Sequence, residues 1–373
     1  MLERIKIDAS PIPDSPPVER SWKKVIPGLG ISLLSLVVVF YFADLQSVTQ
    51  ALQLANYRFV AGSATITLLW LVVRGLVSKT LLRDRPSWLD SFLAVNEGYL
   101  INNILPLRLG ELARAYLLGR KSGLGFFQVF PSVIIERLMD LGMAVGLLLA
   151  TLPLVVGGSW ARSAAFAAGI LVLVLYCGLY LLARFPTRAN TLLASILDRI
   201  PLIGRRVQSF LPDLFSGLEV LTDGRRFLSA AGWVLLNWML AVGQYYLLML
   251  AFFPQARLLW AAFSLGVVSL GIAAPSSPGA VGVLELSLIG ALAVFKLDPS
   301  TALAFALVLH AIQYVLTGAI GAYALARDGD SLTSIYNRIR MLRREPTTPK
   351  PDSLLEDPDR DSLGNKPESK SRH

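Results

Sequence analysis

The stretch NNILPLRLGELAR, residues 102–114, places two arginines, one glutamate, a proline and a glycine inside a very apolar chain. A simple membrane-spanning helix pairs all of its backbone groups internally, and a proline and a glycine disturb that pairing. Irregular backbone is tolerated at membrane depth only where protein or a water-filled cavity satisfies its polar groups. The stretch therefore predicts a broken helix beside a polar cavity.

The composition of the whole chain predicts a membrane protein. Of 373 residues, 54% are apolar and only 16% are charged, and the mean hydropathy is +0.56. About a quarter of the residues are charged in a typical soluble domain, and a helix needs roughly 20 apolar residues to cross the hydrocarbon core. Seven apolar runs cover residues 25–43, 59–82, 129–153, 164–183, 227–253, 258–274 and 301–326. We therefore predict an all-α polytopic membrane protein with about seven full spans and two re-entrant helical hairpins.

Several kinds of site are disfavoured by residue content. The one cysteine, Cys177, allows no disulfide framework and no cysteine-based metal site. The two histidines, His310 and His373, are too few for a histidine metal cluster. No G-x-x-x-x-G-K-[ST] loop is present, so ATP hydrolysis is not indicated. We expect no cofactor, no metal and no nucleic-acid partner.

The distribution of the net charge of +9 predicts the topology. Basic residues cluster near the start of the chain, around residues 83–85, along 184–226 and after 327. The positive-inside rule then places both termini and these loops in the cytoplasm. We divide the chain into a leader (1–24), a transmembrane domain (25–328) and a largely disordered tail (329–373). Within the domain, 184–226 is predicted to form either amphipathic helices on the lipid surface or a helical linker packed on the spans.

Two segments interrupt apolar runs with helix-breaking residues. By counting spans, residues 92–121 should enter and return on the cytoplasmic side, and 258–296 should do so from the outside. The spacing Pro106-x3-Gly110 in the first resembles Pro278-x3-Gly282 in the second, which is the pattern of an inverted repeat. The predicted breaks are Pro106, Gly110, Pro275, Pro278, Gly279 and Gly282.

Ionisable residues gather beside these breaks. Each one costs at least about 2.5–3.5 kcal/mol at the centre of a membrane helix, so it usually faces the bundle interior. Two interpretations stay open: ion pairs that hold the bundle together, such as Arg137 with Glu111 or Asp140, or a substrate site in which Arg108 and Arg114 hold a phosphate bidentately. The residues concerned are Arg108, Glu111, Arg114, Glu136, Arg137, Asp140 and Glu285.

Four further polar residues lie within predicted spans. Arg74 is expected to extend toward the cytoplasmic interface rather than to bind a ligand. His310 is expected to be hydrogen-bonded inside the bundle, with a proton relay as the alternative. Gln244 and Gln313 are predicted to form hydrogen bonds between helices.

Three motifs, NNILPLRLGELAR, VIIERLMDLGMAVGLLL and APSSPGAVGVLE, resemble the flippase-like transmembrane family, the membrane half of bacterial lysylphosphatidylglycerol synthases. The resemblance covers roughly residues 20–328 and implies a location in the inner membrane of a bacterial cell. In the two-domain relatives the membrane part is implicated in moving an aminoacylated phospholipid between leaflets, and a cytosolic domain makes that lipid from aminoacyl-tRNA. The tail has no room for such a domain, so lysyl transfer is not expected. The family's pattern falls on Asn103, Pro106, Arg108, Gly110, Glu111, Arg114, Glu136, Arg137, Asp140, Pro275, Pro278, Gly279, Gly282 and Glu285.

These observations favour a non-enzymatic lipid translocator whose substrate is an anionic or aminoacylated lipid. Two alternatives remain. The first is an accessory subunit of an envelope lipid or glycan synthesis complex, with that complex as its partner or with a second copy of the chain. The second is a membrane enzyme acting on lipid-linked substrates, for which Glu111 and Asp140 could form a carboxylate pair. The PSSPG motif at 275–279 lacks the histidine that membrane phosphatases use.

Overall fold

The structure is a computed structural model that describes residues 26–105, 108–157, 161–188, 191, 223–273 and 276–342. The described residues are 86% helical and contain no strand, which confirms the predicted all-α class. The predicted breaks Pro106 and Pro275, the leader, most of the 184–226 loop and the end of the tail lie outside the described residues.

Thirteen elements follow one another along the described chain. They are α1 (Ile26–Phe42), α2 (Leu45–Leu54), α3 (Tyr57–Leu81), α4 (Trp88–Ile104), α5 (Leu109–Ser122), α6 (Phe126–Val156), α7 (Ala161–Arg184), α11 (Gly224–Phe252), α12 (Leu258–Gly271), the 3₁₀ turn η3 (Pro278–Ala280), α13 (Val283–Ala293), α14 (Pro299–Asp328) and α15 (Leu332–Leu342). We call α4 and α5 the first hairpin and α12 to α13 the second hairpin.

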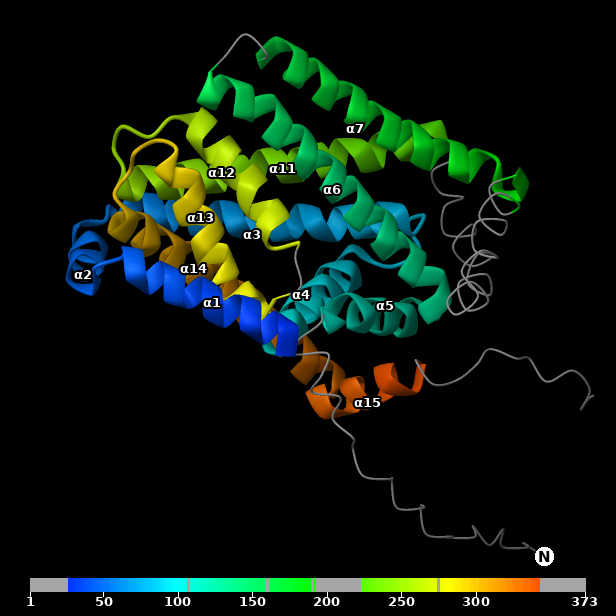
Figure 1. Cartoon of the computed structure of the whole chain (residues 1–373). Helices are drawn as coiled ribbons and strands as arrows, with labels where there is room; N and C mark the ends of the chain where they lie inside the picture. Colours follow the sequence, from blue (N-terminus) through cyan, green and yellow to red (C-terminus); the bar gives the residue numbers. More distant parts are fainter. Residues whose placement is uncertain are drawn as a thin grey trace, which may run out of the picture.

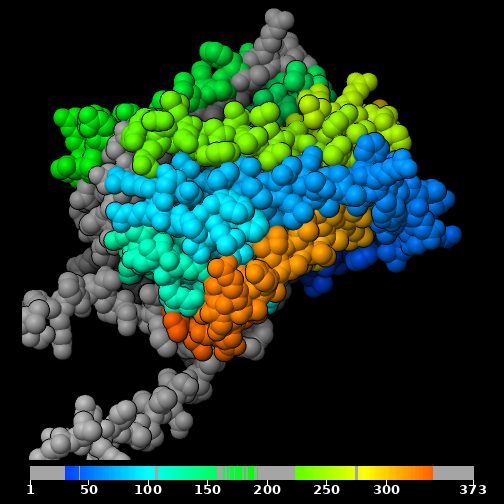
Figure 2. Space-filling model, turned by 180° about the vertical axis from the view of Figure 1, so that it is seen from behind, coloured from blue at the N-terminus to red at the C-terminus, as the bar shows by residue number. Residues whose placement is uncertain are grey.

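Long helices frame the two hairpins (Figure 1). α3 packs along α11, α4 packs against α14, and α12 packs against α6. Seen from behind, α11, α3 and then α4 with α14 form neighbouring bands (Figure 2). Glycines allow the closest crossings: a Cβ on Gly321 of α14 would lie 2.6 Å from the Asn96 carbonyl of α4, and one on Gly266 of α12 would lie 3.1 Å from Leu148 of α6.

Four described helices are long and apolar enough to cross a membrane. They are α3, α6, α11 and α14, and α1 with α2 would make a fifth if this pair, bent by 82°, were one broken span. The prediction of about seven full spans is therefore not confirmed. The run at 258–274 becomes α12, whose 14 residues give only about 21 Å of helix, against the roughly 30 Å of the hydrocarbon core.

Large apolar side chains lie on the outside of the bundle as well as in its core. The exposed fraction is 66% for Leu33 of α1, 62% for Met239 of α11 and 65% for Val315 of α14. Contiguous apolar surface of this extent is unfavourable in water. Together with the apolar helices, it indicates a multi-pass membrane protein.

Candidate functional site

The first hairpin is closed by a glycine contact and an asparagine. A Cβ on Gly110 would lie 2.0 Å from the Gly98 carbonyl oxygen, so α4 and α5 can approach this closely only with glycine there. Asn102, near the end of α4, accepts a hydrogen bond from the Gly110 N–H at 2.7 Å and donates one to Glu111 at 3.2 Å. Asn102 thus satisfies an orphan backbone group at the start of α5.

Arg108 connects the two hairpins. It precedes α5 in the left-handed conformation (φ 52°, ψ 42°), which is uncommon for a residue with a side chain. Its guanidinium donates to the backbone carbonyl of Ile272, just after α12. Among the described residues, Arg108 has no carboxylate within ion-pair distance, so its charge is not neutralised by a direct partner.

Glu136 on α6 is the centre of a buried group of charges. Its side chain is 0% exposed and pairs with three arginines from three helices. Arg74 of α3 lies 2.8 Å away, Arg114 of α5 binds it bidentately with a first contact of 2.8 Å, and Arg137 of α6 lies at 2.9 Å. A buried carboxylate with this many donors is held in place by both charge and geometry.

Asp140, one turn further along α6, completes this group. It receives two hydrogen bonds from Arg74 and one from the Trp238 indole at 3.2 Å, and Arg137 lies 3.5 Å away. Arg74 is only 2% exposed, so the expectation that it extends to the interface is wrong. The reason is that two carboxylates on α6 stabilise a guanidinium inside the bundle. We call Arg74, Arg114, Glu136, Arg137 and Asp140 the Glu136 cluster.

A cavity of about 800 Å³ lies between the hairpins and the long helices. Arginines, carboxylates, amides and hydroxyls line it together with apolar and aromatic side chains. Its polar lining includes Arg74, Asn102, Asn103, Arg108, Glu111, Arg137, Asp140, Asn237, Gln244, Ser269, Ser276, Ser277, Gln313 and Thr317. A cavity of this size and mixed character is typical of a small-molecule or head-group site.

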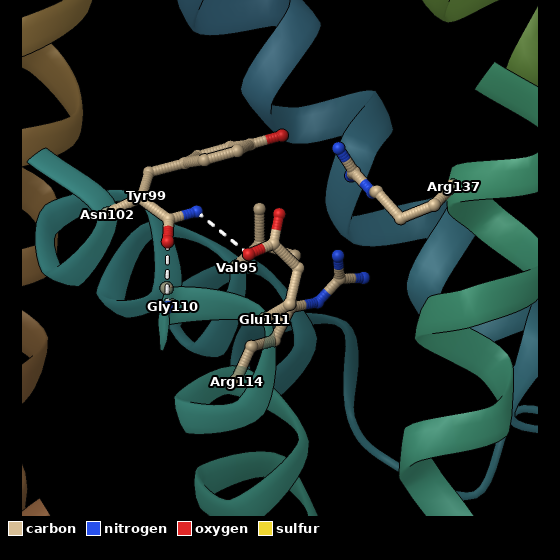
Figure 3. Close-up of a pocket in the computed structure, with 8 residues that line it drawn as sticks. Val95, Tyr99, Asn102, Gly110, Glu111, Arg114 and Arg137 are labelled. Carbon is tan, nitrogen blue, oxygen red and sulfur yellow. Dashed lines mark hydrogen bonds between the residues drawn. The ribbon is translucent and has the colours of Figure 1, made fainter. Parts of the chain in front are cut away.

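A small notch adjoins this cavity at the first hairpin (Figure 3). There the Arg137 side chain extends from α6 toward Tyr99 of α4 and Glu111 of α5. Tyr99 and Glu111 line both the notch and the cavity, so the notch continues the same polar surface.

Positive charge exceeds negative charge on the cavity wall. Three arginines (Arg74, Arg108 and Arg137) face two carboxylates (Glu111 and Asp140), which leaves one positive charge in excess. Arg114, which lines the notch, is balanced by Glu136, which is buried behind the wall. The wall therefore favours an anionic group with several acceptor oxygens.

The second hairpin carries a different buried pair. Glu285 of α13 and His310 of α14 lie 2.6 Å apart, from Oε1 to Nδ1. The other carboxylate oxygen accepts from the Gly282 N–H at 2.7 Å, and His310 Nε2 lies 3.0 Å from the Gly279 carbonyl. The expectation that His310 is hydrogen-bonded inside the bundle is therefore confirmed.

The structure brings together part of the set singled out in the sequence. Asn103, Arg108, Glu111, Arg137, Asp140 and Gly279 line the cavity; Gly110 and Arg114 line the notch; and Glu136 and Glu285 are buried behind the wall, with Gly282 and Pro278 at the tip of the second hairpin. Asn103 donates to Thr317 of α14 at 3.2 Å.

Several site residues were missed from the sequence. Asn102, Tyr99 and Trp238 carry no motif that marks them, although Asn102 directly precedes Asn103 in the quoted stretch. The suggested pairing of Arg137 with Glu111 is not formed, because Arg137 contacts Glu136 and Asp140 on its own helix. Within the described ranges, no group of three or more His, Cys, Asp or Glu side chains could hold a metal ion.

Comparison with known proteins identifies relatives along most of the chain. The family model described as the lysylphosphatidylglycerol synthase TM region matches residues 25–321. A UPF0104 membrane protein of Methanothermobacter thermautotrophicus is 25% identical over an alignment of 304 positions, which covers 78% of this chain and 90% of that protein. A second UPF0104 membrane protein, from Methanocaldococcus jannaschii, is 26% identical over 61% of this chain and 95% of its own length.

A third relative is larger than the aligned region. The glycosyltransferase AglD of Haloferax volcanii is 25% identical over an alignment of 340 positions, which covers 80% of this chain and 54% of that protein. No solved structure matches the chain significantly.

Proposed function

Since this chain belongs to the family of the lysylphosphatidylglycerol synthase TM region, we propose that it binds the head group of an anionic lipid and moves it across the membrane. The observation that carries the proposal is the 800 Å³ cavity whose wall holds three arginines against two carboxylates. A lipid phosphate offers the acceptor oxygens that guanidinium groups bind bidentately.

Arg108 and Arg137 are the best-placed phosphate ligands. Within the part of the chain that the structure describes, Arg108 has a backbone carbonyl as its one partner, and the Arg137 side chain is 35% exposed. Arg114, by contrast, is held bidentately by Glu136 and is 4% exposed, so it stabilises the wall of the cavity and does not bind the lipid. Glu111 and Asp140 would receive a cationic head group, such as an aminoacyl amine.

We further propose that the two hairpins are re-entrant and belong to an inverted repeat. The helix contacts support a repeat. If α3, α4, α5 and α6 are exchanged in order with α11, α12, α13 and α14, the same pairs of helices remain in contact. For example, the contact of α4 with α14 becomes the contact of α12 with α6. Such repeats exchange access to a central site by moving relative to each other. With basic loops inside, the first hairpin opens to the cytoplasm and both termini lie there.

A second candidate is a role in glycan synthesis, with a lipid-linked sugar as the ligand. The relative AglD is named a glycosyltransferase, and its alignment with this chain covers 54% of its length. Neutral hydroxyl and amide groups in the cavity, including Ser269, Ser277 and Gln313, would suit sugar hydroxyls.

The test measures lipid movement in liposomes that contain the purified full chain. The panel is head-group-labelled phosphatidylglycerol, its lysyl derivative and a polyprenyl phosphate sugar. We expect Arg108→Ala and Arg137→Ala to slow movement roughly tenfold or more, since losing a charged hydrogen bond costs about 1.5–3 kcal/mol. Arg58→Ala is the matched control, because Arg58 is exposed at the start of α3, away from the cavity lining.

The panel separates the two candidates. Movement of phosphatidylglycerol or its lysyl derivative supports phospholipid translocation, and movement of the polyprenyl lipid alone supports the glycan role. If the wild type moves none of them, or if the cavity variants behave like Arg58→Ala, translocation through this cavity is wrong.

A further inference from the structure

The Glu285–His310 pair is a buried acid–base pair separate from the Glu136 cluster. The side chains are 4% and 10% exposed. The titratable side chain that faces them is Tyr314, whose ring lies edge-on to His310 with centroids 4.6 Å apart. No arginine or lysine among the described residues forms an ion pair with Glu285, so its charge is balanced by the imidazole alone.

The elements around the pair bring few other titratable groups. Within their described residues, α2, α12 and η3 carry none, and α1 carries only Tyr41, which is 82% exposed. Titratable side chains on α3, α4 and α11 contact residues other than Glu285 and His310. Arg74 pairs with Glu136 and Asp140, and Glu97 pairs with Lys121. Tyr99 stacks on Trp70, and Tyr245 packs on Phe305.

The contacts determine how many protons the pair holds. A backbone carbonyl can only accept, so His310 Nε2 must carry a hydrogen toward Gly279. The contact of 2.6 Å from Nδ1 to Glu285 is favourable only with one more proton between the two atoms. That proton makes the pair neutral overall, whether it is bonded to nitrogen or to oxygen. Without it, two lone pairs would face each other and the buried site would carry one negative charge.

The same proton holds the tip of the second hairpin. Glu285 binds the Gly282 N–H and His310 binds the Gly279 carbonyl, so both ends of the tip depend on the pair. The tip backbone has positive φ at Gly279 (66°) and Gly282 (85°), which glycine adopts without steric cost, and at Ala280 (59°), which is uncommon for a residue with a side chain. Such backbone persists only where its surroundings hold it. The tip also forms part of the cavity wall, at Gly279 and Ala280.

We infer that the Glu285–His310 pair is a proton-binding site that controls the second hairpin. When H⁺ binds, it joins the Glu285 carboxylate and His310 Nδ1 and fixes the tip against α14; when H⁺ leaves to water, the two atoms separate and the tip is released. A transmembrane proton gradient would therefore bias the opening of the cavity. The link to lipid movement rests on the proposed function; the proton site itself does not.

The first experiment observes His310 directly. The chain has two histidines, so ¹⁵N-histidine labelling gives signals for His310 and His373 only, and a His373→Gln variant assigns them. The His310 signals of the full chain in lipid nanodiscs are recorded from about pH 5 to pH 9, and we expect them to report binding and loss of the proton between His310 and Glu285. In Glu285→Gln this transition should shift, because a neutral amide donates to Nδ1 without an extra proton. A His310 signal that is constant over this range, or that titrates identically in Glu285→Gln, overturns the proton site.

The second experiment measures release of the tip. Val281, 37% exposed, is replaced by cysteine in a Cys177→Ser background, and its rate of alkylation by N-ethylmaleimide is measured against pH. Val294→Cys, at the other end of α13 and 46% exposed, corrects for thiol ionisation. We expect the ratio of the two rates to rise several-fold as His310 loses its proton, and to stay flat in Glu285→Gln. A flat ratio in the wild type overturns control of the hairpin.

A third measurement separates this inference from the proposed function. Lipid movement is compared with and without a pH gradient in wild type and in Glu285→Gln, and we expect a response to the gradient in wild type alone. If no lipid moves while the first two readouts hold, the proposed function fails and the proton site stands. Movement that ignores the gradient in wild type overturns coupling of the proton to transport.

Discussion

The two hairpins share one architecture but differ in the buried pair that holds them: one pair contains a permanently charged arginine and the other a titratable histidine. In each, the second arm is joined to the following long helix by a buried pair: Arg114 with Glu136 between α5 and α6, and Glu285 with His310 between α13 and α14. A guanidinium keeps its charge at every working pH, whereas imidazole is the side chain that changes charge near neutrality. The first hairpin is therefore built to stay in place, and the second is built to respond to protons.

The largest expected loss of stability comes from replacing Glu136, the central carboxylate of the Glu136 cluster. Glu136→Gln leaves Arg74 and Arg114 buried without their shared carboxylate, and breaking a buried ion pair in this way costs about 3–5 kcal/mol. The readout is the temperature at which half of the detergent-solubilised protein is still monodisperse after heating. The control is Glu111→Gln, which removes a carboxylate bonded to Asn102. Equal losses in the two variants would show that the Glu136 cluster is not the stabilising centre.

A smaller effect is expected from the glycine that closes the first hairpin. The added methyl of Gly110→Ala would meet the Gly98 carbonyl and the Asn102 side chain, so α4 and α5 must separate at a cost of about 1–3 kcal/mol. Gly290→Ala on α13 is the matched control, because nothing lies within 4 Å of its added Cβ. There, helix propensity should raise the stability by up to about 1 kcal/mol. Thermal stability of both variants checks this, and a stable Gly110→Ala would contradict the tight crossing.

The Glu285–His310 pair should tolerate replacement of the carboxylate by an amide. In Glu285→Gln the amide oxygen can still accept from Gly282 while the amide nitrogen donates to His310, so we expect a loss of about 0.5–1.5 kcal/mol. Glu285→Ala, which cannot do either, should lose more. A loss in Glu285→Gln as large as that in Glu136→Gln would remove the contrast between the hairpins.

The smallest effect is expected outside the membrane-spanning helices, at the ion pair between Arg120 of α5 and Asp330 after α14. The hydrogen bond to Asp330 raises the pKa of Arg120 above its ordinary value, so the guanidinium stays charged throughout the neutral range. Because Arg120 is 36% exposed, Asp330→Asn should cost no more than about 1 kcal/mol. High salt should reduce this difference further. Thermal stability at low and high salt checks both statements, and a salt-independent loss would mean that the pair is effectively buried.

Much of the site could be located from the sequence because membranes penalise charge and broken backbone. Arg108, Glu111 and the ERLMD motif stood out for that reason, and the glycines of both hairpins did as well. Arg74 was misinterpreted because its partners lie 62 and 66 positions further along the chain, on another helix, and spacing alone does not show which helices meet. His310 was expected to be hydrogen-bonded, but its carboxylate partner was not identified.

The sequence by itself determined the all-α class of the protein and the apolar segments that form its long helices, because these follow from apolar length and residue type. The tertiary structure alone decided which charges pair, which of them face the cavity and which lie behind its wall. Ion pairing depends on the rotation and crossing of whole helices. A difference of one residue in helix packing would turn Glu136 away from Arg74 and Arg114, and nothing local in the chain records that choice.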